Sequence, residues 1–219
     1  MEKTHKAIAF FFVFIIALII WELYRVYIKA HPVFTSIAII RYFYVAMVLA
    51  WVTLSIIQLL LIKYQKDELH KKLGKISYIL APILLLSLFF IAKDNFINIA
   101  LIWPKKQNIA VLALSVIPFF AFATLYILAM INKKNMAYHM RYIAGSLLVL
   151  MAPAIGKAFT IYGGMTFRQG FTCFMYITEI IAVLLVVYDM IKANPLKPYL
   201  VTLSVLFAVV IMSLFQFPN

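Results

Sequence analysis

Long apolar segments alternate with short polar ones along almost the whole chain. A helix needs about 20 mostly apolar residues to cross the ~30 Å hydrocarbon core of a bilayer. Segments of that kind cover residues 7–24, 38–62, 73–93, 109–131, 138–162, 171–191 and 199–217. The pattern therefore predicts an all-α protein, an integral membrane bundle of seven transmembrane helices that forms a single domain over residues 1–219.

Proline and glycine mark the ends of the predicted helices. Trp103-Pro104 ends one span, because proline lacks an amide hydrogen and disfavours helix in the residue before it. Gly163-Gly164 and residues 194–198 predict tight turns. Proline also occurs inside predicted spans, where we expect kinked helices: Pro82, Pro118 and Pro153.

The composition supports lipid as the main solvent of the chain. Hydrophobic residues make up 66% and charged residues 12%, with a mean hydropathy of +1.03, whereas soluble domains carry about a quarter charged residues. The net charge of +13 does not indicate nucleic acid, because the cations lie in short clusters between apolar runs and suit lipid headgroups. A single cysteine, Cys173, excludes a disulfide framework and a cysteine-rich metal site.

The distribution of lysine and arginine predicts the orientation. With the N-terminus inside the cell, 12 of the 20 cations fall on the cytoplasmic side, and cytoplasmic loops are typically the more basic ones. This set comprises Lys3, Lys6, Lys63, Lys66, Lys71, Lys72, Lys75, Lys133, Lys134, Arg141, Lys192 and Lys197. We expect a cytoplasmic N-terminus, an outside C-terminus and a multi-pass location in a bacterial cytoplasmic (inner) membrane.

Two predicted helices each carry a polar face that starts at a histidine. On the third span, His70, Gly74 and Ser77 share one face, since successive residues of a helix are 100° apart. On the fifth span, His139 and Ser146 share a face that continues through Pro153 to Lys157, roughly 27 Å further along the axis. Titratable residues at both ends of one face predict that this face points into the bundle or a wet cavity.

Charged residues in the outer half of the bundle form a second candidate site. Glu179 is the most deeply placed carboxylate of the sixth span, and Lys157 and Arg41 are expected at a comparable depth. Asp94 closes the third span on the same side. These four residues predict either a ligand-binding cavity or an internal network of ion pairs that fixes the order of the helices.

The two histidines are the candidates for binding a cofactor. His70 and His139 both start spans at the cytoplasmic face, so they could supply axial nitrogens to haem b, or bind a metal ion with a carboxylate. Gly74, Ser77 and Ser146 would leave room for a flat ring or a close helix contact, and Arg141 could bind a propionate. The alternative is that each histidine lies at headgroup level and binds no ligand.

The two histidine-containing strings also carry a resemblance to a known group. "HKKLGKISYILAP" and "YHMRYIAGSLLVLMAPAIGK" resemble helix openings in bacterial membrane proteins of the DUF2306 group and, more distantly, of cytochrome b561-like proteins. The resemblance covers about 35 residues and implies a similar seven-span outline. The positions that it singles out are His70, Gly74, His139, Arg141, Pro153, Gly156 and Lys157.

Three classes of function are compatible with these features. The first is a haem- or metal-binding membrane module that uses His70 and His139. The second is a small-molecule transporter or receptor that uses the outer charge cluster. The third is a non-catalytic accessory subunit of a membrane complex, with other membrane proteins as partners. The chain carries no phosphate-binding glycine loop, H-E-x-x-H or C-x-x-C motif that would indicate a particular enzyme class.

Overall fold

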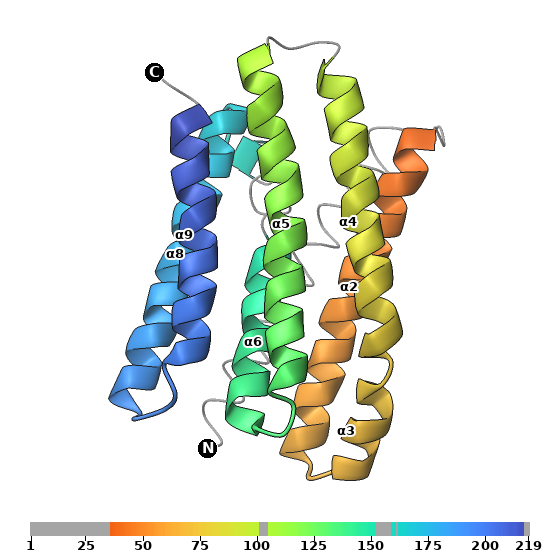
Figure 1. Ribbon diagram of the computed structural model, residues 1–219, viewed down its shortest axis with the longest axis vertical. Helices are drawn as coiled ribbons and strands as arrows, with labels where there is room; N and C mark the ends of the chain where they lie inside the picture. The colour runs from red at the N-terminus through yellow and green to blue at the C-terminus, as the bar shows by residue number, and fades with distance from the viewer. Residues whose placement is uncertain (1–35, 101–104, 152–158, 161, 217–219) are drawn as a thin grey trace. The chain divides into compact units, whose positions relative to one another are not determined.

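The structure, a computed structural model, describes residues 36–100, 105–151, 159–160 and 162–216 (Figure 1). The regular structure in these ranges is helical throughout, as the hydrophobic pattern predicts. The chain divides into two compact units, Met1–Phe90 and Ile91–Asn219, and each is described by itself. The prediction of one domain over the whole chain stays a prediction.

The first unit contains α2 (Ser36–Lys63), α3 (Asp67–Gly74) and the start of α4 (Ser77–Ala100). The predicted third span starts at residue 73, whereas helix already begins at Asp67, and this helix includes His70, which the sequence places on one helix face with Gly74 and Ser77. Asp67 and Glu68 lie in the first turn of α3, where negative charge suits the helix dipole, and Lys71 and Lys72 lie in its last turn. A polar segment next to an apolar span thus forms helix rather than a loop.

One stripe of side chains is buried on each long helix of the first unit. On α2 it includes Val48, Trp51 and Leu59, and on α4 it includes Ala81 and Leu84. The buried positions recur every three or four residues, which is the spacing of a single helix face. Pro82 lies on α4 inside the helix, as predicted.

The second unit is built from α5 (Lys105–Ile131), α6 (Met136–Leu150), α8 (Phe167–Ile191) and α9 (Lys197–Gln216). Helices α5, α6 and α9 contact one another, and α8 contacts α9 (Figure 1). Helix α9 is therefore the element that all three others share. The side chains that fill this unit include Phe122, Leu125, Tyr142, Leu147, Phe174 and Leu206.

Three helices of the described chain are long and apolar enough to cross a membrane: Ile39–Lys63, Asp67–Asp94 and Gln169–Ile191. Two shorter apolar helices span Val116–Ile131 and Lys197–Ala208. Between 28% and 33% of the most apolar window of each long helix is buried by protein, so most of its apolar surface is left for lipid. These are the properties that a membrane protein requires.

The described part of the chain contains six helical segments when α3 and α4 are counted as one run. The first predicted span, residues 7–24, lies outside the described residues. The predicted span 138–162 is described as helix up to Leu150, and its Pro153, Gly156 and Lys157 also lie outside the described residues.

The predicted turn at Gly163-Gly164 is observed, and the turn predicted over residues 194–198 is observed in part, because Lys197 and Pro198 already belong to α9. Gly164 has a φ of +61°, a conformation that glycine adopts without strain. Ala193 has a φ of +51° in the turn that connects α8 to α9, where the sequence predicts a tight turn over residues 194–198. These turns return the chain so that neighbouring helices run in opposite directions.

Helix α6 begins with a side-chain cap. Asn135 has an extended backbone, and its Oδ1 accepts a hydrogen bond of 3.3 Å from the backbone amide of Tyr138. Since a capped amide becomes unsatisfied when the cap is removed, we expect Asn135→Ala to lower the free energy of unfolding by about 1 kcal/mol. Chemical unfolding in detergent micelles measures the difference. Lys134→Ala changes a neighbouring exposed side chain and serves as the control; equal stability of the two variants would contradict the capping role.

Candidate functional site

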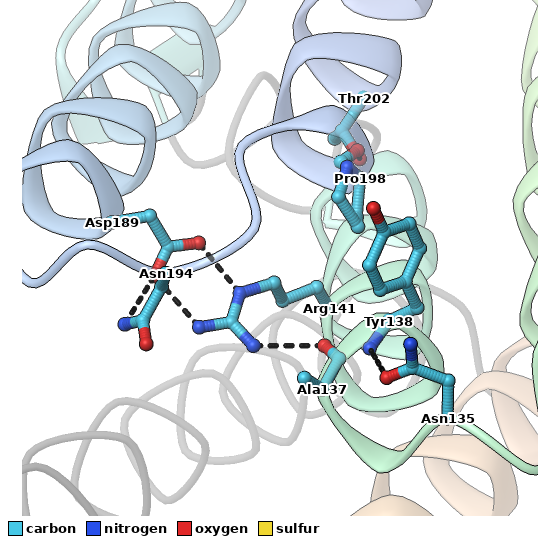
Figure 2. A network of polar contacts seen from close by, with 8 residues as sticks. All are labelled: Asn135, Ala137, Tyr138, Arg141, Asp189, Asn194, Pro198 and Thr202. Carbon is cyan, nitrogen blue, oxygen red and sulfur yellow. Dashed lines mark hydrogen bonds and ion pairs between the residues drawn. The ribbon is translucent and has the colours of Figure 1, made fainter.

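A buried ion pair joins α6 to α8 in the second unit. The guanidinium of Arg141 donates from Nε to Oδ2 of Asp189 at 2.6 Å and from Nη2 to Oδ1 at 2.8 Å (Figure 2). The exposed fraction is 15% for the Arg141 side chain and 1% for Asp189. Two parallel hydrogen bonds of this length are the strongest geometry that an arginine and a carboxylate form.

Neighbouring groups complete the network around this pair. Nη1 of Arg141 donates to the carbonyl oxygen of Ala137 at 2.8 Å, and Nδ2 of Asn194 donates to Oδ1 of Asp189 at 3.0 Å (Figure 2). The Arg141 guanidinium carbon also lies 5.9 Å from the centre of the Tyr199 ring of α9, within cation–π range. The network thus connects α6, α8 and α9 at the end where α6 and α9 begin.

Asp189, the most buried charged residue of the described chain, is not among the residues predicted from the sequence. The carboxylate predicted on the same span is Glu179, which lies closer to its centre. The signal was present in the pattern, because Asp189 interrupts the apolar run "VLLVVYDMI" near the same predicted membrane face as Arg141. A carboxylate and an arginine expected at one depth are candidate partners.

This network changes the role expected of Arg141. A propionate-binding arginine needs hydrogen atoms that point toward the cofactor, whereas the Arg141 guanidinium bonds to Asp189 and to the carbonyl of Ala137. Arg141 is better explained as the residue that neutralises the carboxylate of Asp189. Lys71 and Lys72 of α3, and Lys75 directly after it, belong to the first unit and are exposed.

His139 lies on the first turn of α6, half-buried, and contacts the end of α5. Its Nδ1 lies 2.8 Å from the carbonyl oxygen of Ala129. Because a carbonyl can only accept a hydrogen bond, Nδ1 must carry the proton. The lone pair of the neutral ring is then on Nε2, which is the tautomer found in most histidines that bind a metal or a haem iron.

His70 lies on α3 in the first unit and contacts α2. When the amide of Gln58 is oriented to accept from the Gly74 amide at 2.9 Å, its nitrogen donates to the His70 carbonyl oxygen at 3.1 Å and to the ring Nδ1 of His70. Nδ1 of a neutral His70 then accepts a hydrogen bond, and the proton is on Nε2. The two histidines therefore have opposite tautomers. They belong to different units, so the histidine pair stays a prediction.

The small residues of the predicted cofactor face have local roles. Ser77 Oγ donates to the Gly74 carbonyl and Ser146 Oγ to the Ile143 carbonyl, both at 2.7 Å. Both serines are buried. A hydroxyl that bonds to its own helix is a common way to place serine in an apolar environment.

At Gly145, next to Ser146, helix α6 lies close against α9. A Cβ atom built on Gly145 would overlap the Thr202 hydroxyl and lie 3.0 Å from Thr202 Cγ2. Of the two explanations for small residues on this face, a close helix contact therefore holds at Gly145. By contrast, a Cβ on Gly74 would lie 3.9 Å from the nearest side-chain atom.

The predicted outer charge cluster is described only in part. Arg41 on α2 and Asp94 on α4 are half-buried, and both make interactions. Glu179 on α8 is half-buried, and Lys157 lies outside the described residues. Arg41 belongs to the first unit, whereas Asp94 and Glu179 belong to the second. The cluster stays a prediction.

Within the described residues, no group of three or more histidine, cysteine, aspartate or glutamate side chains is arranged to hold a metal ion. Comparison of the chain with protein-family models, with curated proteins and with solved structures finds no match. The resemblance to the DUF2306 group therefore stays a prediction.

Proposed function

We propose that the protein is a multi-pass protein of a bacterial inner membrane that binds a cofactor, haem b, through Nε2 of His139, with His70 as the second ligand once Gln58 releases its Nδ1 and the ring proton moves from Nε2 to Nδ1. The observation that carries this proposal is the hydrogen bond between His139 Nδ1 and the Ala129 carbonyl. It fixes the tautomer in which Nε2 is able to coordinate iron.

The contact to Ala129 also orients the ring. Ala129 is fully buried in the last turns of α5, so its carbonyl is a fixed acceptor. A histidine that is held by one nitrogen keeps the other in a constant direction, which favours ligation. The exposed Lys71, Lys72 and Lys75 near His70 are the cations that we propose for the haem propionates.

We further propose seven spans with a cytoplasmic N-terminus. The count over the whole chain supports this orientation, because 12 of the 20 lysines and arginines lie on the predicted cytoplasmic side, among them Lys133, Lys134, Arg141, Lys192 and Lys197 at one end of the second unit's helices. Lysine and arginine are enriched on the cytoplasmic side of a membrane. His139 lies at the same end, which places the proposed haem near the cytoplasmic face.

An absorption spectrum of the full-length protein, purified from its native membrane, tests the cofactor. We expect a Soret band that shifts on reduction with dithionite, that disappears in His139→Ala and that weakens or shifts in His70→Ala. His5→Ala and His31→Ala are the matched controls, because the sequence places these histidines in a terminus and a loop. A colourless wild-type protein that binds no added hemin would contradict the proposal. Metal analysis of the same sample tests the alternative proposal, in which the histidines bind a metal ion instead of haem.

A transporter or receptor function is the second candidate. It is favoured by Glu179, whose carboxylate lies in the interior of a helix long enough to cross the membrane. A charged residue at such a position usually faces a substrate or ion pathway. Uptake or binding that is lost in Glu179→Gln, with normal expression, would support this function.

A further inference from the structure

Glu179 lies near the midpoint of the apolar helix Gln169–Ile191. At a rise of 1.5 Å per residue, it is about 15 Å from the first residue of that helix and about 18 Å from the last. Both distances are close to half the hydrocarbon thickness of a bilayer. The carboxyl is therefore as far from bulk water as this helix allows.

The carboxyl lies at the border between the buried and the lipid-facing sides of α8. Met175 and Ala182, one turn away on either side, are buried, while Tyr176 and Val183 on the adjacent stripe are exposed. Oε1 of Glu179 is itself buried, and no donor in the described part of the chain makes a hydrogen bond to it. An ionised carboxylate in such a place is strongly disfavoured.

Among the described residues, the titratable side chains of α9, the helix that packs against α8, lie away from Glu179. Helix α9 packs against α8, and its titratable residues in the described range, Lys197 and Tyr199, are in its first turn. That turn lies beside the Arg141–Asp189 pair. Asp189 is about 15 Å further along α8 than Glu179. The Asp189 carboxylate accepts hydrogen bonds from an arginine and an asparagine, whereas Oε1 of Glu179 accepts none from the described residues.

We propose that the Glu179 carboxyl is a proton-binding site in the membrane interior, occupied at neutral pH so that the side chain is a neutral carboxylic acid. A bound proton removes the charge that the apolar surroundings disfavour, and it needs no partner side chain. Its position at the border of the lipid-facing stripe leaves it accessible from the hydrocarbon phase. The neutral acid is thus within reach of an apolar reagent that is dissolved in the lipid.

A hydrophobic carbodiimide tests the proposal on the protein in its native membrane. The reagent partitions into lipid and reacts with a protonated carboxyl, whose proton moves to a carbodiimide nitrogen while its oxygen bonds to the central carbon. We expect the protein to gain the mass of one dicyclohexylcarbodiimide molecule, and peptide mapping to place it on Glu179. Asp189 serves as an internal control, because its pairing with Arg141 should keep it ionised and unmodified.

Two variants complete the experiment. Glu179→Gln should lose the label while keeping the melting temperature of the wild type. Lys157→Met separates this proposal from the predicted ion pair between Lys157 and Glu179, because a neutral acid is labelled equally with and without the lysine. Label that appears only in Lys157→Met, label that favours Asp189, or no label in either background would overturn the proposal. A labelled Glu179 in wild-type membranes supports it.

Discussion

Asp189→Ala is expected to lower the free energy of unfolding by about 3–5 kcal/mol, the usual result of removing one partner from a buried ion pair. The carboxylate is 1% exposed and accepts hydrogen bonds from Arg141 and Asn194. Without it, the Arg141 guanidinium would remain in a largely apolar environment with a charge that nothing nearby balances. Denaturation in detergent micelles, followed by circular dichroism, measures the loss.

A double variant separates the stabilisation that the two charges give each other from the cost of burying them. Arg141→Met with Asp189→Leu replaces both charges by apolar groups of similar size, and such replacements are often neutral or stabilising. We therefore expect the double variant to be more stable than Asp189→Ala. Lys192→Ala, an exposed cation three residues away, is the matched control and should stay within about 0.5 kcal/mol of the wild type. A double variant as unstable as the single one would show that the two side chains do not stabilise each other.

Gly145→Ala is expected to destabilise the second unit by about 1–3 kcal/mol, because the added methyl group would overlap Thr202 where α6 and α9 meet. Helix propensity alone predicts the opposite sign, since alanine is favoured over glycine by about 1 kcal/mol inside a helix. The direction of the change therefore tests the close contact. The same unfolding assay in micelles provides the measurement.

Gly74→Ala is the matched control for Gly145→Ala. Its new methyl group would meet side-chain atoms of Gln58 at 3.9–4.0 Å, which is ordinary van der Waals contact. We expect no loss of stability there and a gain of up to about 1 kcal/mol from helix propensity. Thr202→Ala should restore most of what Gly145→Ala loses, because it removes the atoms that the methyl group would overlap. If Thr202→Ala does not restore the stability that Gly145→Ala loses, the loss does not come from overlap with Thr202.

The hydrophobic pattern was sufficient to predict helices but not all of their ends. Spans such as 171–191 agree closely with α8, because a long apolar run has few alternatives to helix in lipid. The start at Asp67 was missed because the segment before residue 73 is polar. Acidic residues at the start of residues 67–74 and basic residues at their end are typical of a short helix, and they could have predicted one here.

The site was harder to predict than the helices. The sequence could place Arg141 and His139 on one end of a helix, but their partners, Asp189 and the Ala129 carbonyl, depend on which helices are neighbours. In lipid both faces of a helix are apolar, so hydrophobicity does not reveal the face that meets protein. Small residues are a better signal, because close helix contacts in membranes require small side chains, and Gly145 lies at such a contact with α9.

The connection between α8 and α9 has a practical consequence for labelling the protein. Asn194 donates to Asp189 through its side chain and through its backbone amide, and Ala193 before it has a positive φ. An affinity tag or fluorescent reporter inserted there would pull Asn194 away from the carboxylate that it supports. The exposed α5–α6 turn at Lys134, at the same end of the unit, offers a safer insertion point.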